Sequence, residues 1–345
     1  IPETLLPHKS NILALIYEHQ AKYAEAEKLL LRELNIYTNI QGPKHIAVAY
    51  VLERLAIIFI ETRRYGEAKS LLDQTLAIMK GVHGEEHHEI GRCLYNYGLM
   101  YFRQKMYDSA ESLYKEALAI QRIALTPDHP SLILTLQALG TICSARGFHD
   151  LALSFYEETL ASYLRVLGEE HHWTAWNLWS IGQCFYAKGK YKEAEPYYQR
   201  AFRIQTSVLR PGHPDAIQTL DCLAQMYCHQ RRYAEAEALY KQALETTEAY
   251  VGNEHPDVIV CINKLSRFYY ERKSYNLAEP LYQRVLAIAE TPLGLEHQDT
   301  VSILDDYVKM LERTGRKDDA ERVETVIEAV WPQREGDEEK YLSEG

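Results

Sequence analysis

The chain has 345 residues, with 38 Lys and Arg against 49 Asp and Glu, which gives a formal net charge of -11 at pH 7. Sequence-independent nucleic-acid binding depends on neutralising phosphates with basic residues, so this acidic balance argues against it. The 46% hydrophobic content is ordinary for a folded protein, and 17 Gly with 12 Pro are too few for a collagen-like or low-complexity chain.

The predicted elements repeat along the whole chain. The string YAEAEKLL returns as YGEAKSLL, YDSAESLY, YKEAEPYY, YAEAEALY and YNLAEPLY, always in the same register. The alanine of each string belongs to a series of eight, spaced by 42 residues without insertion or deletion: Ala26, Ala68, Ala110, Ala152, Ala194, Ala236, Ala278 and Ala320. Eight such units account for nearly the whole chain, so a repeat array is predicted rather than separate globular domains.

Each unit is predicted to be a pair of helices. Apolar or aromatic residues stand three and eight positions after the repeated alanine and nine positions before it, which is helical spacing. In the second unit, helix A is predicted over about 46–62 and helix B over about 65–79. Gly147, Gly189 and Gly315, or polar residues in other units, supply the turn between the two helices.

The repeated alanine is predicted to lie where helix B crosses helix A closely, because a larger side chain would overpack that contact. A tyrosine three residues earlier, such as Tyr65, is expected to fill the space at the turn. One unit cannot bury its apolar faces alone, so stacked neighbours must bury them. In the last unit Glu324 and Glu328 replace apolar residues, and they are predicted to face water as in a terminal capping repeat.

The sixth unit carries a recognisable pattern in Leu223, Ala224, Tyr227, Tyr233 and Ala236. This order of small residue, aromatic, tyrosine and alanine resembles the tetratricopeptide repeat. The period of 42 and joints such as LRPGHPD and VGNEHPD resemble the kinesin-light-chain type of that family. The resemblance implies an all-α fold, a right-handed α-solenoid of eight helix–turn–helix repeats, with the A helices lining a concave groove. It assigns residues 1–332 to the solenoid and leaves 333–345 as an acidic tail or linker.

Seven of the 14 histidines also recur every 42 residues, just before helix A: His45, His87, His129, His171, His213, His255 and His297. A metal array is one interpretation. It fails on spacing, because neighbouring repeats are separated by helices about 10 Å wide, whereas a bound metal needs ligands at about 2 Å. The histidines are therefore expected to pack in the joint and cap helix A, and no metal or cofactor is predicted.

No catalytic motif is found: phosphate-binding glycine loops, the nucleophile elbow and the zinc-protease signature are all missing from the sequence. The chain is therefore not expected to be an enzyme. Six cysteines without a C-x-x-C pair are expected to be free thiols of a cytoplasmic protein. No apolar run is long enough for membrane insertion, and the start Ile-Pro-Glu-Thr shows no signal peptide and is typical of a fragment.

In the family it resembles, partners bind in the groove, so the inward positions of the A helices are the predicted site. Its centre is expected to be small, neutral and aromatic, with charge on the flanks. The predicted site residues are Arg92, Tyr95, Asn96, Phe102, Arg103, Gln137, Trp176, Trp179, Gln183, Tyr186, Gln225, Asn263, Lys264, Arg267 and Tyr270.

Trp176 and Trp179 share a helix face and are predicted to anchor a partner, although they could instead pack between neighbouring repeats. Arg92 with Asn96 is suited to holding a carboxylate, as are Lys264 and its neighbours. The alternatives are solvated surface and ion pairs within the groove. The chaperone type of carboxylate clamp is not predicted, because units four to six lack its Lys and Asn positions.

Two functions follow. The first is a non-catalytic scaffold or adaptor that binds a protein or peptide in the groove. The second is a ligand-sensing or regulatory segment of a larger signalling protein, with an effector or nucleotide-hydrolysing domain upstream. An upstream coiled coil would favour a motor adaptor, and an upstream nucleotide-binding domain would favour a sensor. The sequence does not name the partner.

Overall fold

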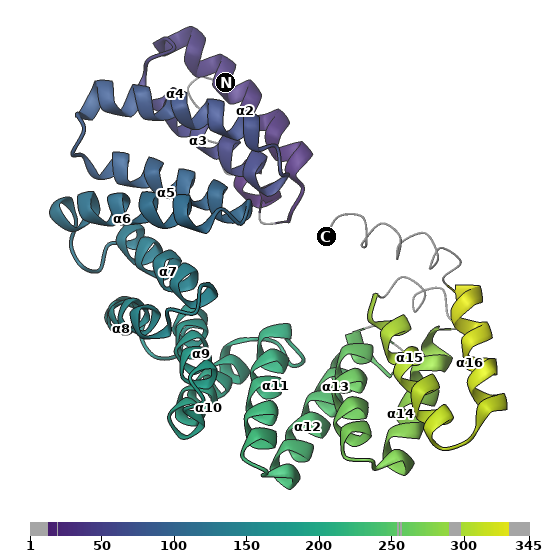
Figure 1. Ribbon diagram of the computed structural model, residues 1–345. Coiled ribbons are helices and arrows are strands. Elements are labelled where there is room, and N and C mark those ends of the chain that lie inside the picture. The colour runs from purple at the N-terminus through teal and green to yellow at the C-terminus, as the bar shows by residue number, and fades with distance from the viewer. Residues whose placement is uncertain (1–12, 19, 254, 256, 290–297, 331–345) are drawn as a thin grey trace. The chain divides into compact units, whose positions relative to one another are not determined.

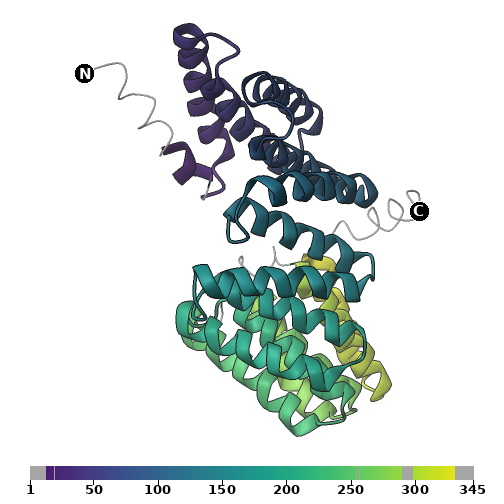
Figure 2. The ribbon, with the colours of Figure 1, turned by 90° about the vertical axis from the view of Figure 1, so that its left-hand side faces the viewer.

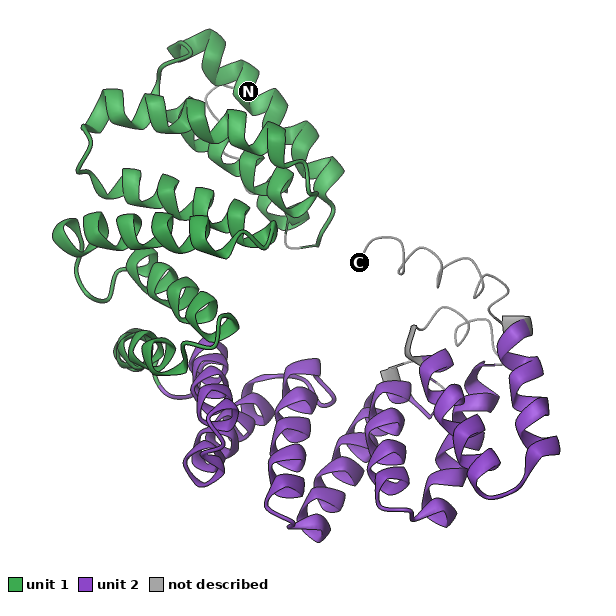
Figure 3. Ribbon diagram, in the orientation of Figure 1, with its two compact units in different colours: residues 1–168 green, residues 169–345 purple. Residues whose placement is uncertain are grey.

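The computed structural model describes residues 13–18, 20–253, 255, 257–289 and 298–330. Every regular element within these ranges is a helix, which confirms the all-α fold class. The chain divides into two compact units, residues 1–168 and residues 169–345, each of which is a stack of helices (Figure 3). Residues 331–345 lie outside the described ranges, so the single solenoid over 1–332 with a following tail stays a prediction.

The helices of unit 1 are α2 (Tyr23–Gln41), α3 (Ile46–Glu61), α4 (Tyr65–His83), α5 (His88–Arg103), α6 (Tyr107–Ala124), α7 (Pro130–Ala145) and α8 (His149–Val166). Those of unit 2 are α9 (His172–Ala187), α10 (Tyr191–Val208), α11 (Pro214–His229), α12 (Tyr233–Val251), α13 (Asp257–Glu271), α14 (Tyr275–Ala289), α15 (Gln298–Arg313) and α16 (Lys317–Val330). Odd-numbered helices are the predicted A helices and even-numbered helices the B helices (Figure 1).

Consecutive helices pack against each other in both units, A on B within a repeat and B on the following A. In the turned view of Figure 2, the teal and green helices of unit 2 lie side by side. Helix B of the second repeat is longer than predicted, because α4 continues past residue 79 to His83. Its last turn carries the exposed Val82, outside the apolar pattern, and is closed by a hydrogen bond from the Gly84 amide to the Lys80 carbonyl at 3.0 Å.

The turn between helices A and B depends on one residue with a positive φ, five positions before the repeated alanine. In every described repeat that residue adopts the left-handed conformation, with φ between 55° and 81°. Glycine, which favours it, is present only at Gly147, Gly189 and Gly315, whereas Ala21, Arg63, Lys105, Arg231 and Lys273 adopt it with a side chain. The turn was predicted at glycine or at polar residues, and the structure shows that both kinds adopt the same left-handed backbone.

The repeated histidines begin the A helices as N-caps. The Nδ1 atoms of His45, His87, His129, His171 and His213 each accept a hydrogen bond from the backbone N–H two residues on, at 3.2–3.3 Å. This bond satisfies a backbone donor that the first turn of a helix leaves without a partner. The expected capping role is confirmed at these five positions, while His297 lies outside the described residues.

The repeated alanines are fully buried from Ala26 to Ala278, and Ala320 is 5% exposed, as close helix packing requires. In every repeat but the last, a buried tyrosine or leucine stands four residues later. A Cβ atom added to Gly98, Gly140 or Gly182 would lie 2.5–2.8 Å from the ring of Tyr114, Tyr156 or Tyr198, respectively. Glycine is therefore required there by a close approach of side chain to backbone.

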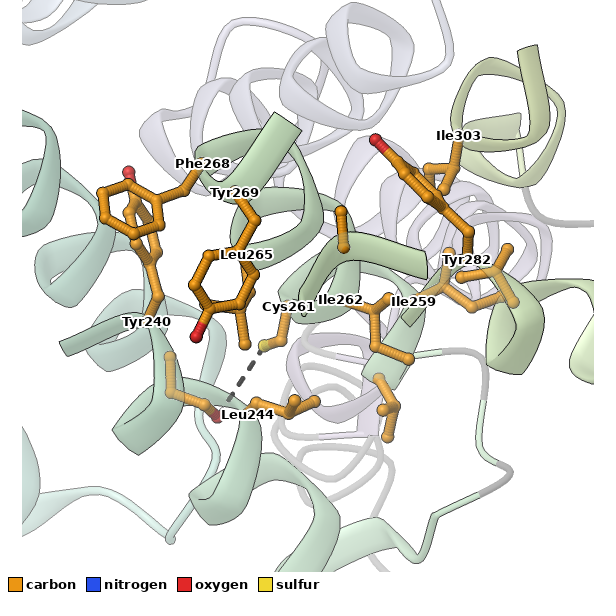
Figure 4. Packing of buried hydrophobic residues seen from close by; sticks show 14 of the residues in the cluster. Tyr240, Leu244, Ile259, Cys261, Ile262, Leu265, Phe268, Tyr269, Tyr282 and Ile303 are labelled. Carbon is orange, nitrogen blue, oxygen red and sulfur yellow. Dashed lines mark hydrogen bonds between the residues drawn. The ribbon is translucent and has the colours of Figure 1, made fainter. Parts of the chain in front are cut away.

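Stacking buries apolar residues between neighbouring repeats, in three clusters among the described residues of unit 1. In unit 2, one buried cluster extends from Ala194 to Ile327. Figure 4 shows that Cys261, Ile262 and Leu265 of α13 lie between Tyr240 of α12, the preceding B helix, and Tyr282 of α14, the B helix of the same repeat. The repeats thus bury their apolar faces against one another, as the sequence predicted.

The A helices lie on the inner side of each stack. In unit 1, α5 contacts both α3 and α7, and in unit 2, α13 contacts α15, whereas no successive B helices make contacts of this extent in the described ranges. In these pairs, the A helices of neighbouring repeats lie closer to each other than the B helices do. Among the described helices, none has the length and apolar character needed to span a bilayer.

Candidate binding surfaces of the A helices

In unit 1 the A helices enclose a pocket of about 300 Å³. Helix α3 contributes Glu53, Arg54 and Ile57, and α5 contributes Arg92, Tyr95 and Asn96. The remaining lining residues are Gln121, Ser131 and Leu134.

An ion network contributes to the lining of this pocket. Arg92 Nη2 lies 2.7 Å from Glu53 Oε2 and 2.6 Å from Glu89 Oε2, and the Asn96 amide donates to Glu53 Oε1 at 2.6 Å. Glu53 is 5% exposed and Asn96 is 4% exposed. The predicted carboxylate-holding pair therefore contacts a carboxylate, but one that belongs to the chain itself.

Burial, more than any other cause, raises the pKa of Glu53 to about 7. The neighbouring Glu89 raises it too, while Arg92 and the Asn96 amide lower it. Near neutral pH this carboxyl group is thus close to its midpoint of ionisation, because one arginine serves two carboxylates in a site with little water.

The other predicted residues of unit 1 are also engaged. The Tyr95 ring packs 5.3 Å from Tyr114, and the Phe102 ring lies 5.8 Å from the turn residue Tyr107. Arg103 pairs with Glu61 of the preceding A helix at 2.8 Å. Gln137 accepts a hydrogen bond from the Tyr163 hydroxyl at 2.7 Å.

In unit 2 a larger pocket of about 710 Å³ lies between α11, α12 and α13. Lys264 Nζ contacts Asp221 Oδ2 at 2.6 Å, and the amide of the exposed Gln225 donates to the same oxygen at 3.0 Å. Arg267 pairs with Glu271 at 3.1 Å. The half-buried Asn263 also lines this pocket.

The predicted Trp176 and Trp179 of α9 are half-buried. Leu178 and Ile181 of the same helix are fully buried. Trp179 packs against the core cluster of unit 2, and so does Tyr186. The most exposed of the α9 tryptophans is Trp173, at 46%, which the sequence did not single out.

The remaining aromatic and amide positions of unit 2 join neighbouring helices. Tyr186 lies 5.4 Å from Tyr191 and 5.7 Å from the ring of the exposed His229. Tyr270 packs 5.9 Å from Tyr275. The Gln183 amide donates to Cys222 Sγ at 2.9 Å.

Burial raises the pKa of Cys222 to about 11, so its thiol stays protonated at neutral pH and is a poor nucleophile. Among the described residues, no three His, Cys, Asp or Glu side chains are grouped so that they could hold a metal ion.

Sequence reasoning missed Glu53, Gln121 and Ser131. Glu53 could have been found, because it lies three residues before the small residue Ala56, as the predicted Tyr95 and Trp179 lie three before Gly98 and Gly182. Gln121 lies on a B helix, and no inward position was assigned to those helices.

The comparisons with known proteins agree with this fold. The family model of the tetratricopeptide repeat matches residues 6–81, 49–123, 92–163, 131–207 and 215–291. Comparison with curated protein sequences gives no significant match.

Several solved structures share the fold at low identity. One holds the nearly identical TPR-like repeats of a candidate kinesin light chain from Podosopora anserina, at 23% identity and a TM-score of 0.53, covering 60% of this chain and 98% of that one. Another is a signal-transduction ATPase with a tetratricopeptide repeat sensor from Pyrococcus horikoshii, at 15% identity and a TM-score of 0.66. The match covers 87% of this chain and 43% of that one. A third is the apo form of the quorum sensor NprR from B. thuringiensis, at 16% identity and a TM-score of 0.60. The match covers 94% of this chain and 87% of that one.

Proposed function

The chain belongs to the tetratricopeptide-repeat family, and we propose that it is a non-catalytic scaffold or adaptor whose A-helix surfaces bind a segment of a partner polypeptide. The observation that carries this proposal is that cationic side chains on both surfaces are already paired within the chain. Arg92, Lys264 and Arg267 each contact a carboxylate of the chain itself. What remains for a partner is two open pockets and half-buried aromatic rings, which are typical of binding hot spots.

Trp176 and Trp179 are the proposed anchors in unit 2. Both are half-buried, so each ring keeps surface that a partner can cover while its other side rests on the fold. Aromatic side chains fixed in this way bind at little entropic cost, because their rotamers are already restricted. Trp173 at the start of α9 offers a matched control, since it is exposed and was not placed on the inward face.

The test is selection of a random twelve-residue peptide library against the whole chain, followed by affinity measurement for one enriched peptide. Hot-spot aromatics contribute about 2 kcal/mol or more, so Trp176→Ala with Trp179→Ala should weaken binding at least about tenfold. Trp173→Ala should bind like the wild type. Circular dichroism should show unchanged helix content in all variants. Absence of any enriched peptide, or equal affinity in the double variant, would contradict the proposal.

The second candidate is a ligand-sensing repeat segment of a larger signalling protein. Its support is the shared fold with the repeat sensor of the Pyrococcus horikoshii ATPase, of which this chain spans 43%. The similarity to kinesin-light-chain-type repeats supports the adaptor instead. The full reading frame decides, because a coiled coil upstream favours the adaptor and a nucleotide-binding domain favours the sensor.

A cytoplasmic location is part of the proposal. All six cysteines are free, and four of them are buried within helices: Cys93, Cys143, Cys184 and Cys261. Free thiols that serve as small apolar side chains are typical of a reducing compartment.

A further inference from the structure

The 300 Å³ pocket of unit 1 has apolar walls and a polar floor. Ile57, Tyr95 and Leu134 form the walls, and Leu134 is 44% exposed although it is apolar. Glu53 and Gln121 lie at the floor and are 5% and 0% exposed, respectively. A bound group would therefore pass hydrophobic surface before it reaches these buried polar atoms.

The charges around the floor do not balance. Glu53 and Glu89 both pair with the single guanidinium of Arg92. Arg54, at the other side of the pocket, is held by Glu18 at 2.7 Å. Counted together, these side chains carry three carboxylates and two guanidinium groups. When Glu53 is ionised, one negative charge is therefore left over in a partly desolvated site, where a cation is favoured and an additional carboxylate is disfavoured.

Gln121 gives an independent indication of a ligand. Neither its side-chain nitrogen nor its side-chain oxygen has a hydrogen-bond partner, although the residue is completely buried. Its Cγ would lie 2.9 Å from a Cβ on Gly91, so the absence of a side chain at residue 91 is what admits Gln121 to this place. Leaving such an amide unpaired is unfavourable, and a donor entering the pocket would satisfy its oxygen.

We infer that this pocket receives a lysine side chain of the partner polypeptide, with its ammonium group at Glu53 and its hydrocarbon stem along Ile57 and Leu134. The ammonium brings three donors, and the floor and rim offer acceptors in Glu53, Gln121 and Ser131. The positive charge of the ammonium group balances the excess negative charge of the carboxylates. This inference rests on the proposed function and adds the chemistry of the partner at one position.

The pocket can be tested apart from any peptide with n-butylammonium, which reproduces the end of a lysine. Methyl resonances of Ile57 and Leu134 would report its binding to the whole chain by NMR. 1-Pentanol, of similar size and without charge, should bind about tenfold more weakly, because a charged hydrogen bond is missing. Equal binding of the two probes would overturn the inference.

Two variants make the assignment specific. Glu53→Gln should abolish the preference for the ammonium, and Gln121→Met, of similar shape, should reduce it several-fold. Glu158→Gln is the matched control, because it removes one carboxylate from the surface of α8, where Glu158 pairs with Arg122. Thermal unfolding identifies any variant that fails to fold. A preference unchanged in both Glu53→Gln and Gln121→Met would contradict the inference.

Dependence on pH provides a further readout. Binding of a cation favours the ionised form of Glu53, so affinity for n-butylammonium should rise between pH 6 and pH 8, as this group with a pKa of about 7 loses its proton. The other charged groups that face it are Arg92 and Glu89 of α5, with Arg54 and its partner Glu18 beside them. An affinity that is flat across this range would argue against a role for Glu53.

The peptide selection then tests the partner. Peptides enriched on the wild type should share a lysine at one position, and Glu53→Gln should lose that preference. Peptides enriched without a common lysine would contradict this inference and leave the proposed function intact. Absence of enriched peptides, together with a clear preference for n-butylammonium, would contradict the proposed function and the polypeptide source of the ammonium.

Discussion

Side-chain size at two facing positions sets how closely the helices of one repeat approach. Glycine in α5, α7 and α9 faces Tyr114, Tyr156 and Tyr198, respectively. In the second repeat the corresponding residues are Ala56 and Leu72, both buried. In the second to fifth repeats the two positions thus change together, a larger residue on helix B going with a smaller residue on helix A. The sixth and seventh repeats depart from this, with Ala224 and Ser266 on helix A and Tyr240 and Tyr282 on helix B.

This size matching predicts that Gly140→Ala destabilises the protein. The new Cβ would lie 2.6 Å from the Tyr156 ring, and overpacking of about 1–3 kcal/mol should exceed the gain of about 1 kcal/mol from helix propensity. In a Tyr156→Leu background, which reproduces the second repeat, the cost of the alanine should largely disappear. Urea unfolding of the four proteins in the cycle measures the coupling, and an equal cost in both backgrounds would contradict the size matching.

Five of the described A helices begin with a histidine N-cap. Each of the five histidine caps must be unprotonated at Nδ1 to accept its hydrogen bond. His87 is special because its ring stacks on His83 at 4.1 Å and lies 4.3 Å from His88. Burial, followed by these two histidines, lowers the pKa of His87 below its usual 6.5.

The sign of the resulting pH dependence follows from the lowered pKa. The folded state disfavours protonation of His87, so its contribution to stability is complete above pH 6.5 and is lost as the pH falls below that value. His87→Asn keeps a capping side chain without a titrating ring. Between pH 7.5 and pH 5.5 the melting temperature should therefore fall more for the wild type than for the variant. Parallel curves for the two proteins would show that His87 does not contribute.

At the scale of the whole molecule, each described repeat contacts mainly its neighbours. Joints between repeats are reinforced by arginines such as Arg232, which pairs with Glu195 of the preceding B helix at 2.9 Å and stacks 3.9 Å above Tyr227. Arg64 and Arg316 form the equivalent ion pairs with Glu27 and Glu279. Stability is therefore expected to be a sum of local terms, as in other linear arrays.

The local character of these contacts predicts a confined response to a core change. Ala236 is fully buried where α12 crosses α11, so Ala236→Leu should cost about 1–3 kcal/mol by overpacking. Hydrogen exchange should accelerate in α11, α12 and α13 and stay near wild type in unit 1. Ala249→Leu, near the end of α12 and exposed, is the control. A global loss of protection would contradict the linear description.

The exposure of the last B helix agrees with its composition. Glu324 and Glu328 of α16 are both exposed, at positions where earlier repeats bury apolar side chains such as Tyr282 and place Leu286 at a half-buried site. The prediction that these acids face water is confirmed. The pair Trp331-Pro332 predicts the end of this helix, because proline disfavours helix in the residue before it, but both residues lie outside the described ranges.

The sequence by itself determined the order of the helices, the buried alanines, the histidine caps and the family, because a register kept over eight units repeats each local signal many times. It could not determine which charged groups of the predicted surface are already paired. Asn96 meets Glu53 and Lys264 meets Asp221 across neighbouring A helices, in each case 43 residues apart. Only tertiary packing decides such partners, since pairing depends on the side chains brought together between repeats and on the water excluded there.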